Sequence, residues 1–152
     1  SNPSAVKVRR IEVRSCSAVI QLSGLTVVGT RAPILNIGRS NVGIVNITIQ
    51  PNGDMEYYYS SYAVAIGRFS NVYANNFNVF ANSTRDGIVT HISVVHFYDL
   101  SIKNCKIGLS IGDSSNVSTG IVLFYNQPTF EGNTLDVAKS GAGSIISGLE
   151  GQ

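Results

Sequence analysis

Three carboxylates are candidates for acid–base chemistry: Asp54, Glu56 and Asp86. Glycoside cleavage needs two carboxyl groups about 5–10 Å apart, one to protonate the leaving group and one to act as nucleophile or base. If the chain coils on itself, Asp86 follows the loop that matches the one holding Asp54 and Glu56, and stacked strands lie about 4.8 Å apart. The sequence therefore predicts these acids as the catalytic candidates of a glycosidase or lyase. The alternative, which the sequence favours, is that they are solvated loop acids.

Four of the seven tyrosines fall in the same stretch as the first two acids: Tyr57, Tyr58, Tyr59 and Tyr62. Aromatic faces stack on sugar rings, and the phenol hydroxyl adds a hydrogen bond. This cluster is the best candidate for a carbohydrate-binding site. An equally strong alternative is that some of these rings close a coil or form a contact between subunits.

Two arginines share one position in the chain, because Arg39 and Arg68 each follow directly on Ile-Gly. We expect them to stack on one face of a repeating fold, with Asp113 at the matching place in a later repeat. Charges at matched positions can form a surface ladder or an ion pair between chains.

The remaining reactive residue types argue against several classes of function. His91 and His96 have no cluster of Cys or Glu near them in the sequence, so we predict no metal site and no cofactor. The net charge is +2 with scattered basic residues, which argues against nucleic-acid binding. No apolar run reaches the roughly 18 residues of a membrane span, so we expect no membrane insertion. We expect Cys16 and Cys105 to be buried thiols rather than a disulfide.

The elements that must position these residues are short β-strands. Apolar residues alternate with polar ones, β-branched types dominate, and helical spacing is nearly absent. Only 13% of the residues are charged, which suggests that some faces meet other chains or lie in a stacked interior.

A repeat organises the chain. The segment from Ser40 to Ile49 returns in altered form from Ser70 to Val79, and its apolar pattern extends in both directions. Successive repeats start about 22 residues apart, which is the length of one coil of a parallel β-helix; one longer step of about 30 residues predicts an insertion at Pro51 to Tyr62. The expected inward-facing sets are Ile20, Leu25 and Val27; Val42, Ile47 and Ile49; Val72, Phe77 and Val79; Val95, Leu100 and Ile102; and Val117, Val122 and Phe124.

One residue precedes the alternating pair of each repeat. Asn and Gly accept left-handed backbone angles, and stacked Asn side chains can hydrogen-bond from coil to coil, so this position predicts an asparagine ladder. The position is occupied by Gly24, Asn46, Asn76 and Asp99 in successive coils, and then by Ile121. A further match (Phe130, Leu135, Val137) follows too soon, which predicts a distorted last coil.

The pattern Ser-Asn-Val followed by Asn-x-Ile-x-Ile resembles the right-handed parallel β-helix repeat of pectate-lyase-like proteins and bacteriophage tailspikes. The match runs from about Val19 to Val137. It implies an all-β, single-stranded parallel β-helix of about five coils in one domain, with a lead-in at residues 1–18, coils at 19–137 and a cap or interchain tail at 138–152. About five coils are too few for a typical pectin-degrading enzyme of this class, so the chain looks more like part of a tailspike or tail fibre.

This resemblance implies a homotrimer on the virion tail, outside the cell, that binds bacterial surface polysaccharide and gives a rigid scaffold for host attachment. Two alternatives stay open. One is an endoglycosidase or lyase acting on capsule or O-antigen through Asp54, Glu56 and Asp86. The other is a structural shaft or trimerisation unit without a ligand.

Overall fold

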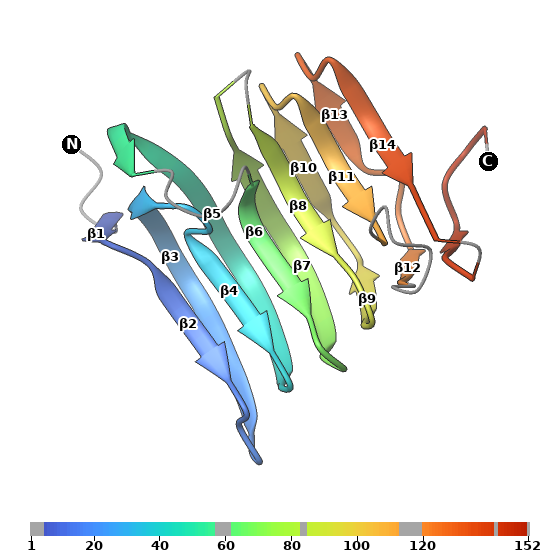
Figure 1. The fold of residues 1–152 in the computed structure, drawn as a ribbon, viewed down its shortest axis with the longest axis horizontal. Coiled ribbons are helices and arrows are strands. Elements are labelled where there is room, and N and C mark those ends of the chain that lie inside the picture. The colour runs from blue at the N-terminus through green and yellow to red at the C-terminus, as the bar shows by residue number, and fades with distance from the viewer. Residues whose placement is uncertain (1–4, 57–61, 83–84, 113–119, 142, 152) are drawn as a thin grey trace.

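The structure is a computed structural model that describes residues 5–56, 62–82, 85–112, 120–141 and 143–151, with the side chains of residues 53–56 outside the described part. These residues form an all-β parallel solenoid of about five coils, and they contain no helix. In Figure 1 the coils follow one another in chain order from the N-terminal end to the C-terminal end. The prediction of an all-β parallel β-helix of about five coils is therefore confirmed.

Two sheets of parallel strands make up the solenoid. The larger sheet contains β1 (Ala5–Val8), β3 (Val19–Arg31), β5 (Asn41–Glu56), β7 (Asn71–Phe80), β9 (Val94–Phe97), β10 (Leu100–Lys103), β12 (Ile121–Phe124), β13 (Thr129–Glu131) and β15 (Ile145–Ser147). The smaller sheet contains β2 (Ile11–Arg14), β4 (Leu35–Gly38), β6 (Tyr62–Gly67), β8 (Asp86–Thr90), β11 (Ile107–Ile111) and β14 (Leu135–Lys139).

The larger sheet bends within each coil, so the solenoid has three faces. The bend falls at Gly24, Asn46 and Asn76, whose φ angles of 71°, 54° and 51° lie in the left-handed region. Strands β3, β5 and β7 run through the bend, whereas in later coils it separates β9 from β10 and β12 from β13. We call the part of the larger sheet before the bend the first face, the part after it the second face, and the smaller sheet the third face.

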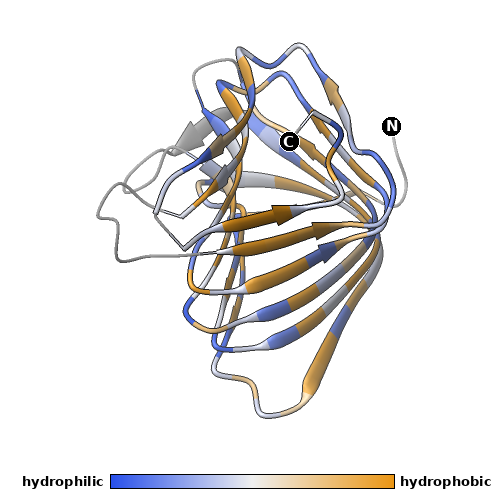
Figure 2. Cartoon of the chain, turned by 90° about the vertical axis from the view of Figure 1, so that its right-hand side faces the viewer, coloured by the Kyte–Doolittle hydropathy of each residue, from blue (hydrophilic) through white to orange (hydrophobic). Residues whose placement is uncertain are grey.

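The core is built from columns of apolar side chains that repeat from coil to coil. Val42 is paired with Val72, and Val72 with Val95, and all three are buried. Each such side chain contributes about 1.5–3 kcal/mol through burial. Figure 2 shows hydrophobic residues recurring along the strands of the successive coils. The first four predicted inward-facing sets are confirmed by the strand register.

The predicted insertion also lies where the spacing placed it. Pro51 still pairs with Gly29, but the next pair joins Arg31 to Glu56, so the register shifts there. Strand β6 then begins at Tyr62.

The fifth predicted set is correct only in part: Val122 and Phe124 are buried as expected, Val117 lies outside the described residues, and the register assigned to the set is wrong. Val122, rather than Val117, is the residue paired with Val95, and Phe130 is the residue paired with Ile102. The reason is a second insertion between the end of β11 at Ile111 and the start of β12 at Ile121. The sequence did not reveal it, because Val117 lies at the interval of about 22 residues that the repeat predicts.

Two related expectations fail for the same reason. Ile121 pairs with Val94 on the first face and therefore takes no part in the asparagine ladder. Leu135 and Val137 belong to β14 on the third face, where they pair with Ile107 and Leu109. Their match to the repeat comes early because they continue a column of the third face, and the strand register is not distorted there.

A column of serines joins the coils at the turn between the third and first faces. The hydroxyl of Ser70 accepts a hydrogen bond from the backbone N–H of Ser40, and that of Ser93 accepts one from the N–H of Ser70. Each hydroxyl also donates to a carbonyl of its own turn, Ser70 to Gly67 and Ser93 to His91. This serine column satisfies backbone groups that lie outside the strand ladders.

Candidate functional site

The structure describes the predicted site residues only in part. Tyr57, Tyr58 and Tyr59 lie outside the described residues. Asp54 and Glu56 stand at the end of β5, but their side chains are likewise outside the described part.

The two remaining predicted residues come together on the third face. Tyr62 starts β6 and Asp86 starts β8, and the two are direct neighbours in the parallel register. Burial raises the pKa of Asp86 above its ordinary value, opposed by a hydrogen bond with the backbone of Ile107 and by the charge of Lys106. A raised pKa is what a general acid needs, because it keeps the proton available nearer neutral pH.

A group of stacked rings on the first face was not among the predicted sites. Val72 and Ala74 point inward, so the alternation of the strand turns Tyr73 outward; His96 is turned outward in the same way by Val95 and Phe97. Tyr73 and His96 are paired in register, and their rings stack with centroids 4.3 Å apart.

Two tyrosines of the following turns complete this group. Tyr125 stacks on Tyr98 with centroids 4.5 Å apart and lies 5.9 Å from His96. His96 Nδ1 and the hydroxyl of Tyr125 share a hydrogen bond of 2.9 Å. Burial lowers the pKa of His96, which favours the neutral imidazole. We call Tyr73, His96, Tyr98 and Tyr125 the aromatic strip.

The aromatic strip is open to solvent. Tyr73 is 46% exposed and Tyr125 is 53% exposed, although each is stacked against another ring. Stacking of this kind holds the rings in fixed orientations, so they offer flat apolar area at little entropic cost.

A polar hollow of about 200 Å³ lies beside the strip, where the first face turns into the second. Its lining is dominated by amides and hydroxyls, with the carboxylate of Asp99 as the one charged group among its described residues. Side-chain amides tie this bend together, because Asn76 donates to Asn46 over 2.8 Å and Asn126 donates to Asp99 over 3.1 Å. The predicted asparagine ladder therefore exists at its central positions. We call this hollow the amide groove.

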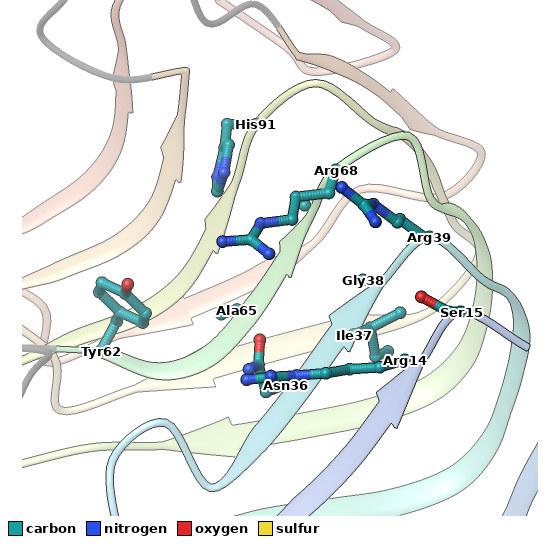
Figure 3. A pocket seen from close by; sticks show the side chains of 11 residues that line it. Arg14, Ser15, Asn36, Ile37, Gly38, Arg39, Tyr62, Ala65, Arg68 and His91 are labelled. Carbon is teal, nitrogen blue, oxygen red and sulfur yellow. The ribbon is translucent and has the colours of Figure 1, made fainter.

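A second hollow, of about 340 Å³, lies on the third face. It is lined by Arg14, Arg39 and Arg68 together with Asn36, Tyr62 and His91, and Figure 3 shows these side chains around it. We call it the arginine groove. The matched positions of Arg39 and Arg68 are confirmed, since the N–H of Arg39 donates to the carbonyl oxygen of Arg68 over 3.1 Å.

Other reactive groups stay apart in the described part of the chain. No cluster of three or more His, Cys, Asp or Glu side chains suited to a metal ion occurs there. His91 borders the third face while His96 lies on the first. Both cysteines are free thiols; burial raises the pKa of Cys105 to about 12, whereas Cys16 is only partly buried. A search of the same residues for a helix that could span a membrane found none.

Comparison with known proteins adds no assignment: no protein-family model, no curated protein and no solved structure matches this chain.

Proposed function

We propose that this solenoid binds bacterial surface polysaccharide along the aromatic strip and the amide groove beside it. The observation that carries this proposal is the strip itself: three exposed tyrosines and a half-buried histidine, stacked in fixed orientations. The apolar faces of sugar rings stack on exposed aromatic rings, and rings that are already held in place lose little entropy when a ligand binds.

The amide groove supplies the other half of sugar recognition. Sugar hydroxyls both donate and accept hydrogen bonds, and side-chain amides such as those of Asn76 and Gln127 can do the same. A flat aromatic platform next to amides is therefore suited to a carbohydrate chain rather than to a charged polymer such as nucleic acid.

The biological setting follows from the resemblance to tailspikes. We place the solenoid on a phage tail as a rigid homotrimeric scaffold for attachment to the host surface. The low share of charged residues, 13%, supports faces that meet other copies. Light scattering on the purified chain tests this part, and a monomeric mass at micromolar concentration would contradict it.

The binding experiment compares the strip with another exposed ring. Glycan-array and cell-binding assays are run on the unmodified chain, on Tyr73→Ala with Tyr125→Ala, and on Phe69→Ala. Phe69 is 82% exposed and lies outside the strip, so it controls for the loss of an exposed aromatic side chain. We expect the double variant to lose binding and the control to keep it. A trimer that binds no glycan would favour the structural shaft instead.

A second candidate function is cleavage of the same polymer, as an endoglycosidase or lyase. It is favoured by the position of Asp86, which starts β8 as the register partner of Tyr62, the last residue of the predicted insertion, and whose pKa is raised by burial. Incubation with capsule or O-antigen and a reducing-end assay tests it. Full cleavage by Asp86→Asn would remove Asp86 from the catalytic role, and absence of cleavage by the unmodified chain would remove the activity.

A further inference from the structure

We infer that the arginine groove is a second binding site, which takes the acidic group of a saccharide: a carboxylate, sulfate or phosphate carried on a sugar ring. It lies on the third face, in the other sheet from the aromatic strip, so it neither requires nor follows from the proposal above.

The hollow exists because small residues stand at consecutive outward positions of the third face. Gly38 pairs with Gly67 in the register of β4 and β6, and Ala65 stands two residues before Gly67. At Gly67 the space above the backbone is taken by the imidazole of His91, since an added Cβ would come within 2.7 Å of that ring. At Gly38 an added Cβ would meet no atom within 4 Å, so the fold does not need a glycine there for space.

Two of the three guanidinium groups are placed at a conformational cost. Arg39 and Arg68 have φ angles of 50° and 55°, in the left-handed region that glycine or asparagine adopts far more easily. They stand in neighbouring coils, so two like charges share one edge of the hollow. Among the described residues, neither arginine forms an ion pair. Only 13% of the residues in the chain are charged, so two unpaired charges side by side are unusual for it. The same turn is also left-handed at Ser15 and Ile92 in other coils, so the angle belongs to the turn, and what the two arginines add there is positive charge.

The third guanidinium, that of Arg14, approaches from the preceding coil. Figure 3 shows its side chain extending to Asn36, while the side chain of Arg68 reaches across the hollow toward Tyr62. Glu12 lies 3.2 Å from Arg14 but also 3.1 Å from Arg10, so one carboxylate is shared by two arginines. None of the described residues that line the groove is acidic. The excess positive charge is therefore left facing the hollow.

The chemistry of the lining selects the ligand. A guanidinium presents paired N–H donors that match the oxygens of a carboxylate, sulfate or phosphate. Asn36 and Tyr62 add neutral hydrogen-bonding groups, and the Tyr62 ring offers a flat wall against which a sugar can lie. The volume of about 340 Å³ falls at the small end of ligand pockets, which suits one acidic sugar unit with part of its neighbour.

The test measures binding by calorimetry and by shifts of the arginine side-chain N–H signals in NMR spectra. The probes are glucuronate, a sulfated glucose and glucose 6-phosphate, with neutral glucose and inorganic phosphate as comparison ligands. We expect at least one acidic sugar to bind and glucose not to bind. The acidic sugar that binds best identifies the acid. Equal binding of glucose and the acidic sugars would overturn the proposal, and so would phosphate binding as tightly as the best acidic sugar.

The variants separate the groove from general charge effects. Arg68→Gln and Arg39→Gln each remove one charge-assisted contact and should weaken binding about tenfold. Gly38→Glu should abolish binding by placing a carboxylate among the arginines, with Gly38→Ala as the control that the position accepts a side chain. Lys103→Gln removes one positive charge from the second face, where Lys103 pairs with Glu131 at 2.9 Å, and should leave binding unchanged. Unchanged binding in both arginine variants, or equal loss in Lys103→Gln, would overturn the assignment.

Discussion

Asn46 and Asn76 each hold a left-handed backbone conformation, and their side-chain amides join one coil to the next. Asn is one of the few residues that adopt this conformation readily, and here its side chain also finds a partner at the same position one coil away. The two roles can be separated experimentally, because a glycine at this position keeps the left-handed backbone conformation but loses the side-chain amide contact.

Asn76→Ala should lower the free energy of unfolding by about 1–2 kcal/mol, because alanine is strained at positive φ. Asn76→Gly should lose less, since glycine accepts the backbone angle and only the side-chain contacts with Asn46 and Asn78 are lost. Urea unfolding followed by circular dichroism measures both. Equal losses in the two variants would mean that the amide contact, rather than the backbone angle, sets the cost.

Thr90 is the polar exception in an apolar column of the third face. It pairs with Ile66 on one side and with Ile111 on the other, it is fully buried, and its hydroxyl has no hydrogen-bond partner. A buried hydroxyl without a partner destabilises the folded state, so Thr90→Val should raise the free energy of unfolding by about 1 kcal/mol. Thermal unfolding of the variant checks this. A lower melting temperature would show that the hydroxyl does bind a group inside the core.

The turns between the third and first faces depend on the serine column. Ser40 and Ser70 are almost fully buried, and each hydroxyl bonds to backbone groups in two coils. A turn held by side chains in this way stays closed even though its backbone groups lie outside the strand ladders.

Ser70→Ala should destabilise the fold by about 1–3 kcal/mol, because the buried N–H of Ser40 loses its acceptor. Ser17→Ala, in the exposed turn before β3, is the matched control and should change stability little. Denaturant unfolding of the two variants gives the comparison. A loss of similar size in the control would contradict a specific role for the column.

The sequence predicted well those elements whose spacing repeats. Val42, Val72 and Val95 recur at nearly constant intervals, so their column followed from periodicity alone. Val122 was predicted to face inward but was given the wrong place in its coil, because an insertion before β12 lengthens that coil and an apolar residue at Val117 kept the expected interval. Periodicity therefore predicts strands but cannot place an insertion that happens to preserve the pattern.

The candidate sites were harder to predict for a related reason. Tyr73 and His96 are recognisable only when the outward positions of neighbouring coils are compared, and the sequence search followed the inward ones. The match of Arg39 with Arg68 was visible, but the hollow they border depends on Gly38 and Gly67 and on Arg14 from another coil. Contacts across coils are a property of the register, which the spacing of the core residues determines only after the insertions are known.

At the scale of the whole molecule, stability should be greatest in the middle coils. Strands β5 and β7 pair on both sides and carry fully buried columns, whereas β13 and β15 each pair on one side and lie largely exposed. Hydrogen–deuterium exchange followed by mass spectrometry should therefore show slow exchange in β5 and β7 and fast exchange in β13 and β15. Uniform exchange along the chain would indicate a single cooperative unit with no fraying at this end.

Every strand pair in the described solenoid is parallel, so the long axis has a direction. Turning the molecule end for end does not reproduce the same surface. Along the first face, Tyr73 comes before His96 in one direction and after it in the other. A polysaccharide is also directional, with a reducing and a non-reducing end. A glycan lying along the aromatic strip would therefore have one preferred polarity, and copies arranged around a threefold axis would all present it to the cell surface in the same sense.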